Sequence, residues 1–313
     1  MATHLPKAAP PLTSTVRHDI YADIDPRHAL QNAARGLSVL VTGSGRGVGR
    51  SEALAFAEAG AQKVVIASRS KAELEAVRNA IGRLAEGCEV VMVACDLTDP
   101  ASVDALFQEA GDVDVLVNNA GYLEPCVSIR DSNPDDWMRT QRINIDGTYL
   151  ATRAYLRAAA SKGWLDSVSD KKGKLCVINT SSIGSAGTRP GFSSYQSGKS
   201  QINRFTEFLH FEEPSIKTWA LHPGGVMTKL ARDSMPPDTH GLLTDTPELA
   251  AGFAVWLATQ SDADFLRGRY VSANWDITQL LEKRDEIIEK NMLWTRVLGQ
   301  EQVMPNATQV HIA

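Results

Sequence analysis

A tyrosine and a lysine four residues apart, Tyr195 and Lys199, are the strongest chemical signal in the sequence. On a helix, residues at this spacing lie on the same face, so the ammonium group would stand near the phenol. A phenol with a pKa of about 10 is a poor acid-base catalyst at neutral pH, and a fixed positive charge favours its phenolate. Ser182 follows a predicted strand and offers a hydroxyl that could hold a substrate carbonyl. The three residues predict proton transfer to or from a carbonyl oxygen.

The pair alone is weak, because short motifs occur by chance and serines at a strand end are usually turn formers. The elements that would position these side chains decide between the two interpretations. Apolar strands are expected at residues 37–41, 64–67, 89–94, 113–117, 175–180, 218–221 and 269–273. Helical sequence separates them, with one long helix over 134–160. This alternation predicts an α/β fold in a single domain: a doubly wound, parallel, Rossmann-like sheet with helices on both faces.

A glycine-rich string, TGSGRGVG at residues 42–49, joins the first strand to the first helix. Glycines let the backbone approach a pyrophosphate, whose charge faces the N–H groups at a helix N-terminus. A plain glycine turn is the alternative, but the strand–turn–helix–strand context favours dinucleotide binding. Asp96, residues 118–121, Ser182 and residues 223–228 also follow strands. A parallel sheet would therefore gather all these polar groups at one edge.

Composition excludes several classes of function. The chain has 313 residues, a net charge of −5 and a pI near 5.8, which gives no electrostatic case for binding nucleic acid. No apolar run approaches the ~20 residues of a membrane span, and the first residues lack the hydrophobic segment of a secretory signal. The four cysteines show no metal-ligand spacing. We expect a cytoplasmic protein without a metal and without a membrane partner.

Three regions of the chain are expected. Residues 1–36 form a polar, proline-dotted arm that could dock through Ile20, Tyr21 and Ile24, residues 37–276 form the catalytic domain, and residues 277–313 form a helical extension. Residues 228–245 look irregular. Thr246 is expected to cap the helix that follows, in the sequence Thr-Pro-Glu.

Taken in order, these motifs resemble those of the short-chain dehydrogenase/reductase family, over roughly residues 36–275. The resemblance rests on TGxxxGxG at 42–49, NNAG at 118–121, Asn144 on the long helix, Ser182, YxxxK at 195–199, and Pro-Gly at 223–224. Each motif alone is modest, and the full series is specific. Asn274-Trp275-Asp276 departs from the Asp-Gly-Gly that the family often has after its last strand.

The resemblance implies a mobile substrate loop at about residues 228–245, and it implies a role for each matching residue. Tyr195 would be the general acid in reduction and the base in oxidation. Lys199 would lower the pKa of Tyr195 and bind ribose hydroxyls, Ser182 would hold the reacting oxygen, and Asn144 would hold a water for proton relay. Cofactor contacts would come from Gly43, Arg46, Gly47, Val48, Gly49, Ser68, Arg69, Asp96, Leu97, Asn118, Asn119, Ala120, Gly121, Tyr195, Lys199, Pro223, Gly224, Val226 and Thr228.

The sequence favours NADP(H) over NAD(H). An NAD site usually has a carboxylate about 20 residues beyond the glycine turn, and here Ser68 stands there with Arg69 beside it. Arg69 and Arg46 would grip a 2′-phosphate, with no carboxylate nearby to repel it. Two solvated surface arginines are the alternative interpretation.

We expect an NADP-dependent enzyme that interconverts a ketone or aldehyde and an alcohol. Tyr122, Trp137, Ile183 and Phe192 suggest a medium-sized apolar substrate, although core packing would explain them equally well. The alternatives are an NAD-dependent alcohol dehydrogenase, an enzyme of the same fold without net redox chemistry, and a non-catalytic dinucleotide-binding sensor or scaffold. By the resemblance, a homodimer or homotetramer would form through the helices of Asn144 and Tyr195. Small side chains at Ala151, Ala154, Ala158 and Ala159 would permit close packing between them.

Overall fold

Seven parallel strands form a single sheet at the centre of the computed structural model, which describes residues 11–166, 169, 171 and 173–297. The strand order is β3-β2-β1-β4-β5-β6-β7. The strands are β1 (Ser38–Thr42), β2 (Lys63–Ser68), β3 (Glu89–Ala94), β4 (Val115–Asn118), β5 (Cys176–Thr180), β6 (Lys217–His222) and β7 (Tyr270–Ser272). The predicted fold class is confirmed. Because the order reverses between β1 and β4, a crevice is expected there at the carboxyl ends of the strands.

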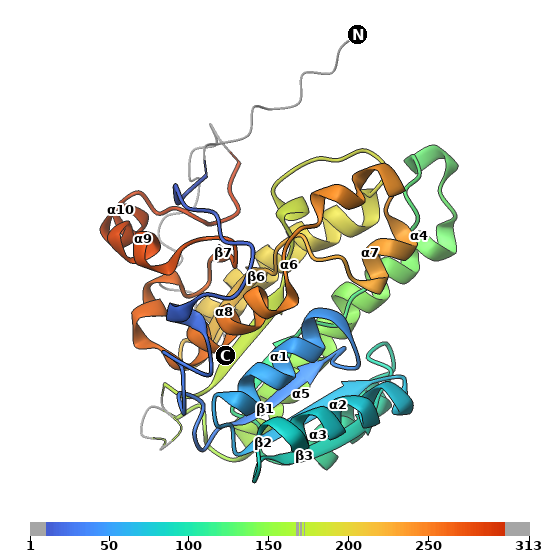
Figure 1. Cartoon of the computed structure of the whole chain (residues 1–313). Coiled ribbons are helices and arrows are strands. Elements are labelled where there is room, and N and C mark those ends of the chain that lie inside the picture. Colours follow the sequence, from blue (N-terminus) through green and yellow to red (C-terminus); the bar gives the residue numbers. More distant parts are fainter. Residues whose placement is uncertain (1–10, 167–168, 170, 172, 298–313) are drawn as a thin grey trace.

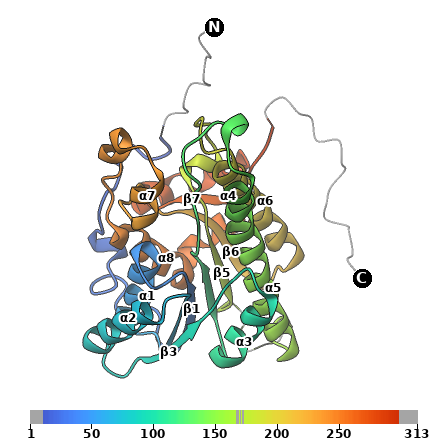
Figure 2. The same ribbon diagram turned by 90° about the vertical axis from the view of Figure 1, so that its right-hand side faces the viewer.

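Helices cover both faces of the sheet, as Figure 2 shows with the sheet between two layers. One layer contains α1 (Gly47–Glu58), α2 (Lys71–Leu84) and α8 (Pro247–Thr259). The other contains α3 (Pro100–Ala110), α5 (Gly147–Ser161) and α6 (Ser193–Glu212). Successive strand residues alternate between the two cores: Val39 and Val41 face the first, and Leu40 faces the second. Burial on both faces explains why the strands are continuous apolar runs.

The long helix expected over residues 134–160 is present, with one irregularity. It consists of α4 (Pro134–Gln141), a π-helical segment (Arg142–Asp146) and α5, which follow one another without a break. Asn133 caps the start by accepting hydrogen bonds from the N–H groups of Asp135 and Asp136. Asn144 lies in the π-helical segment, a kind of irregularity that is frequent at functional sites.

One expectation about the C-terminal third is wrong, and another is met in part. Residues 228–245 are not irregular but largely helical, with α7 (Lys229–Ser234) and a 3₁₀ helix (Pro237–Leu242) (Figure 1). Met235 separates them because a residue before proline is forced into extended backbone. The expected helical extension begins with two short helices, α9 (Ile277–Glu282) and α10 (Arg284–Glu289), and its part from residue 298 lies outside the described residues. No helix in the described part of the chain has the length and apolarity to cross a bilayer.

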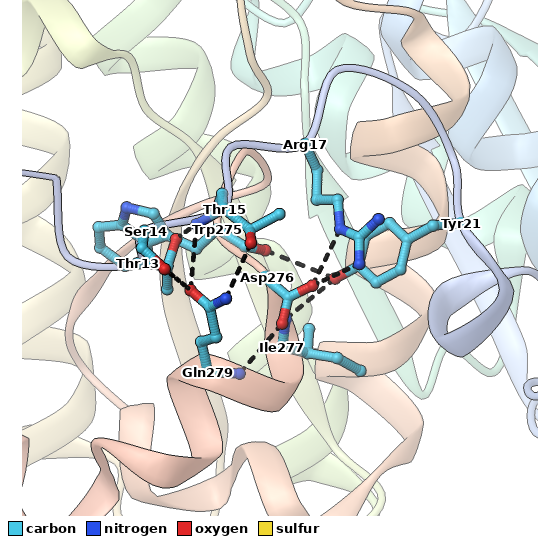
Figure 3. A network of polar contacts seen from close by, with 9 residues as sticks. All are labelled: Thr13, Ser14, Thr15, Arg17, Tyr21, Trp275, Asp276, Ile277 and Gln279. Carbon is cyan, nitrogen blue, oxygen red and sulfur yellow. Dashed lines mark hydrogen bonds and ion pairs between the residues drawn. The ribbon is translucent and has the colours of Figure 1, made fainter.

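The N-terminal arm docks on the domain, as expected for Ile20, Tyr21 and Ile24. Ile24 is fully buried, and Ile20 and Tyr21 pack against the same core. Figure 3 shows the polar contacts of this docking, in which Arg17 donates two hydrogen bonds to Asp276 at 2.6 and 2.9 Å. The first ten residues lie outside the described part.

The departure from the family pattern after β7 is explained by this arm. Asn274 donates to the backbone oxygen of Arg17 at 2.8 Å, and Asp276 is the partner of the Arg17 guanidinium. The arm also occupies the hydroxyl of Thr246, which donates to Asp19 at 2.5 Å. Thr246 therefore makes no side-chain cap on α8, contrary to expectation.

A buried carboxyl in α1, Glu52, makes stability depend on pH. Its side chain is fully buried, and neither oxygen has a hydrogen-bond partner among the described residues. Burial alone raises its pKa from 4.5 to about 8, so the folded state holds a proton that the unfolded state releases above pH 4.5. The contribution of Glu52 to the free energy of unfolding is fully present below pH 4.5. This contribution is lost as pH rises through about 8, which lowers the free energy of unfolding by a few kcal/mol.

We therefore expect Glu52→Gln to change the pH profile of stability. The amide cannot ionise, so the variant should gain stability relative to the wild type as pH rises from about 5 to 9. Urea unfolding of both proteins across this range measures the difference, which removes the contributions of other groups. A difference that is constant with pH would show that Glu52 does not titrate in this window.

Candidate active site

The glycine turn packs tightly against the NNAG segment at the carboxyl ends of β1 and β4. A side chain at Gly43, whose φ is +65°, would come within 2.7 Å of the Ala120 backbone, and one at Gly49 within 2.2 Å of the Asn119 amide. Asn119 donates from its side chain to the Thr42 backbone oxygen at 3.0 Å. Thr42 in turn accepts from the N–H groups of Asn119 and Ala120 through its hydroxyl. The turn thus keeps a fixed shape with bare backbone at the N-terminus of α1.

Tyr195, Lys199 and Ser182 are brought together beside this turn by α6 and the end of β5. The Lys199 ammonium lies 5.6 Å from the centre of the Tyr195 ring, as their spacing on the helix predicts. Lys199 is 4% exposed and donates to the backbone oxygen of Thr180. Ser182 faces the phenol closely enough to lower its pKa. The arrangement offers two hydroxyl groups to one substrate oxygen.

In the protein without cofactor the pKa of Tyr195 is raised, whereas the sequence predicts a lowered pKa, and the contribution of Lys199 stays a prediction. Burial raises the pKa of Tyr195, and the Glu124 carboxylate adds to the increase, whereas only the Ser182 hydroxyl opposes it. Burial also lowers the pKa of Lys199 to about 8, so its positive charge is itself destabilised. Both groups lose water on burial, which disfavours the charged form of each.

Asn144 holds the loop that follows the NNAG segment. Its side-chain oxygen accepts from the N–H of Tyr122 at 2.7 Å, and its amide donates to the backbone oxygen of Tyr122 at 2.8 Å. The Asn144 backbone oxygen accepts from the Thr148 hydroxyl. These contacts show Asn144 as an anchor of the loop, and its role in holding a water stays a prediction.

The corner expected to bind a 2′-phosphate contains carboxylates. Arg46 pairs with Glu73 of α2 at 2.6 Å, and a second oxygen of Glu73 would lie 2.9 Å from a side chain at Gly45. Ser68 borders the same space. Arg69 lies near enough to Asp96 to lower the pKa of that carboxyl, although hydrogen bonds from Thr98 lower it more. The expectation of a corner free of carboxylates is therefore wrong.

The segment after β6 lies against the glycine turn. A side chain at Gly47 would come within 3.2 Å of the Thr228 methyl group, and Thr228 caps α7 by accepting from the Ala231 N–H. Asp245 accepts from the Gly225 N–H at 2.6 Å and from Asn274 at 2.9 Å. Its other oxygen pairs with His18 of the arm at 2.6 Å. The arm is thus linked to the predicted Pro223–Thr228 segment.

The remaining residues that were predicted to contact the cofactor lie in different parts of the fold. Asn118 is buried, and its amide joins Thr152 of α5 to Asn179 of β5, which is a structural role. Leu97 packs against Gly147 at the start of α5. Val48 is buried in α1, and Gly121 lies beside the Asn144 side chain. Pro223, Gly224 and Val226 are half-buried in the segment after β6.

Three acidic residues at the site escaped the sequence reasoning. Glu73 belongs to a capping-box pattern with Ser70, which indicates a helix start but not that its side chain turns to Arg46. Asp245 precedes the Thr-Pro start of α8 and resembled a plain turn residue. Glu124 is a lone acid in a loop, and nothing in its local sequence shows that it reaches α6. Long-range contacts of this kind need the fold.

The described residues fit a dinucleotide. The bare glycine backbone and the N-terminus of α1 suit a pyrophosphate. Ser68 and Glu73 border the space beside Gly45 that would take one ribose, and Lys199 and Tyr195 lie together on α6 for the other. The polar edge predicted from the sequence is therefore assembled at the switch point between β1 and β4.

Known proteins are similar to this chain in sequence. A family model described as short chain dehydrogenase matches residues 38–238. Short chain dehydrogenase mpl6 of Monascus purpureus is 36% identical over 296 residues, which cover 91% of this chain and 96% of that protein. Short chain dehydrogenase tazN of Aspergillus terreus is 37% identical over 289 residues, which cover 88% of this chain and 59% of that protein.

Solved structures show the same architecture. The 3-ketoacyl-(acyl-carrier-protein) reductase from Brucella melitensis, complexed with NADH, has a TM-score of 0.65 and 29% identity, and the match covers 76% of this chain and 97% of that one. The KRED1-Pglu enzyme has a TM-score of 0.64 and 29% identity, with 75% and 100% of the two chains covered.

Proposed function

This chain belongs to the short-chain dehydrogenase/reductase family of oxidoreductases, and on that premise we propose that it interconverts a ketone or aldehyde and an alcohol with NADP(H). The observation that carries the proposal is the meeting of Tyr195, Lys199 and Ser182 beside the glycine turn. A dinucleotide-binding scaffold needs the turn but not these three side chains. This favours an enzyme over the non-catalytic alternative.

The roles of the residues follow from their chemistry. A bound nicotinamide cofactor supplies or accepts the hydride at the carbonyl carbon. Ser182 donates a hydrogen bond to the substrate oxygen, and Tyr195 gives that oxygen its proton in reduction or removes it in oxidation. Lys199, which is buried beside Tyr195, stabilises the phenolate that remains after reduction.

The preference for NADP(H) is proposed on the strength of Arg69. No carboxylate stands at Ser68, the usual position in an NAD site, and a guanidinium can form a planar double contact with phosphate. Arg46 would have to break its ion pair with Glu73 to bind the 2′-phosphate. Its contribution to phosphate binding is therefore smaller than the sequence alone indicates. The Brucella melitensis structure contains NADH, so the preference rests on the residues of this chain.

Exposed apolar side chains next to Ser182 and in residues 228–245 support an apolar substrate of medium size. Ile183, next to Ser182, is 69% exposed, and Leu242, within residues 228–245, is 73% exposed. Trp137 and Phe192 are less available, because Trp137 donates to Ser193 and Phe192 is buried. A phosphorylated sugar would leave the exposed apolar groups unmatched. We propose a ketone or alcohol with an apolar body, in a cytoplasmic setting.

A homo-oligomer is proposed through α5 and α6. Ala151, Ala154 and Ala159 are buried within the chain, so they cannot provide the close helix packing between subunits that the sequence suggested. Large apolar side chains are exposed instead, namely Tyr149 on α5 and Phe208 and Phe211 on α6. A contiguous patch of such groups would mark an interaction surface.

We expect light scattering at micromolar concentration to give at least twice the mass of one chain. Phe208→Ser should shift the mass toward that of a monomer, because it removes apolar surface from α6, whereas the exposed Ile288→Ser on α10 should not. A single-chain mass for the wild type would contradict this proposal.

The function itself is tested by turnover. Purified protein is mixed with NADPH and a panel of apolar ketones, and cofactor absorbance is followed. Loss of NADPH that depends on the ketone supports a reductase. Cofactor binding without turnover of any ketone, or of any alcohol with NADP, would favour the scaffold alternative.

A further inference from the structure

Helix α6, which carries Tyr195 and Lys199, begins without a capping side chain of its own. Its N-cap position is Phe192, which cannot accept a hydrogen bond through its side chain. The first N–H groups of a helix have no partner within the helix and need an acceptor from elsewhere. At the site, the N–H of Tyr195 itself is one of these groups.

Glu124 supplies the missing acceptor from a loop 70 residues earlier in the chain. One oxygen accepts from the N–H of Ser194 at 2.9 Å and from the N–H of Tyr195 at 3.0 Å, and the other accepts from Tyr195 at 3.1 Å. Glu124 is only 3% exposed. A carboxylate is favoured at this place because it faces the positive end of the helix and accepts charge-assisted hydrogen bonds.

The two residues before Glu124 hold other parts of the site. Tyr122 exchanges two backbone hydrogen bonds with the Asn144 side chain, and the Leu123 oxygen accepts from Ser234 of α7 at 2.8 Å. Three consecutive residues therefore bind the π-helical segment, α7 and the start of α6. Displacement of this loop would change the position of Tyr195 relative to the other two elements.

We infer that Glu124 is a positioning residue for Tyr195: its carboxylate caps α6 and fixes the phenol relative to Asn144 and α7. This inference rests on the proposed function, in which Tyr195 transfers the proton. Glu124 acts through the backbone and through its charge, and it is not assigned any contact with substrate.

The charge of Glu124 gives the inference a distinctive signature. The groups that face the phenol are Lys199 on α6, Ser182 after β5 and Glu124 after β4. Of these, Glu124 raises the pKa of Tyr195, so removing its charge should move that pKa downward. In the reduction direction, activity falls as pH rises through the pKa of Tyr195, and this fall should occur at lower pH in the variant.

The test compares Glu124→Gln and Glu124→Ala with the wild type. Glu124→Gln keeps an acceptor oxygen but loses the charge, so we expect kcat to fall about tenfold and the alkaline limb to move to lower pH. Glu124→Ala leaves the N–H groups without a partner and should lower kcat about 100-fold, as expected for a displacement near 1 Å. The Kd for NADPH should change little in both, because the glycine turn is untouched.

Asp131→Asn is the matched control. Asp131 lines the same small cavity of about 210 Å³ as Glu124, but its carboxylate contacts Ser128 and Arg130 and not α6. It should leave both kcat and the pH profile as in the wild type.

Each outcome decides a different point. Wild-type kcat and an unmoved alkaline limb in both Glu124 variants, with an active wild type, would overturn the inference alone. An inactive wild type that binds NADPH would overturn the proposed function instead. If neither Glu124 variant gives folded protein by circular dichroism while Asp131→Asn does, Glu124 serves folding and the inference is wrong.

Discussion

Replacing Tyr195 with Phe is expected to lower kcat by a factor of 10² to 10⁴, the usual contribution of a general acid or base. The phenol faces Ser182 and is placed to exchange a proton with an oxygen that Ser182 holds, and Phe fills the same space as the ring. Binding of NADPH, measured by fluorescence titration, should be nearly unchanged, because the pyrophosphate and adenosine contacts lie elsewhere. Single-turnover kinetics should place the loss in the chemical step.

Tyr149→Phe serves as the control for this change. Tyr149 is a half-exposed tyrosine on α5, so the variant loses a hydroxyl of the same kind away from the site. It should keep the wild-type rate. Turnover of the Tyr195 variant within tenfold of the wild type would reject Tyr195 as the proton donor.

The second large effect is expected in the choice of cofactor. Ser68→Asp combined with Arg69→Ile should lower the ratio of kcat/KM for NADPH over NADH by roughly 100-fold or more. A charge-assisted contact to phosphate is worth about 1.5–3 kcal/mol, or roughly one to two powers of ten, and the new carboxylate adds repulsion of the phosphate. The same carboxylate can accept hydrogen bonds from the ribose of NADH. Initial rates with both cofactors measure the ratio.

Glu73→Gln tests the same corner by a change that should increase the preference for NADPH. Removing this carboxylate frees Arg46 and takes a negative charge away from the space beside Gly45 and Ser68. The KM for NADPH should fall several-fold, whereas the KM for NADH should change little. A rise in the KM for NADPH would mean that Glu73 holds Arg46 in the position that binds phosphate.

The layered fold could be predicted from the sequence because burial on both faces makes parallel strands apolar throughout. The strand Glu89–Ala94 has the expected bounds, and the helix Pro100–Ala110 begins where Asp99 and Pro100 give a clear helix-start signal. Residues 228–245 look irregular in sequence because they contain two adjacent prolines. In the structure Met235 and Pro236 separate two short helices, and Pro237 begins the second.

The candidate site was only partly predictable from the sequence. The observed site differs from the predicted one mainly in its charged side chains. Tyr195, Lys199 and Ser182 are recognisable because helix and strand geometry fix their relative positions. Glu73 and Glu124 reach the site through side-chain directions and loop paths that local sequence does not determine. The pKa of Tyr195 also depends on burial, which appears only when the helices and strands have packed. Sequence spacing predicts which groups lie near one another, but the fold determines how burial and neighbouring charges shift the pKa of each group.

The proposed NADP-dependent exchange between a carbonyl and an alcohol can be measured with purified protein. Initial rates with NADPH or NADH and apolar ketones are followed by cofactor absorbance. We expect ketone-dependent oxidation of NADPH with a kcat/KM at least tenfold above that for NADH. Turnover with NADH that equals or exceeds that with NADPH would contradict the cofactor assignment, and no turnover of any ketone or alcohol would contradict the enzyme.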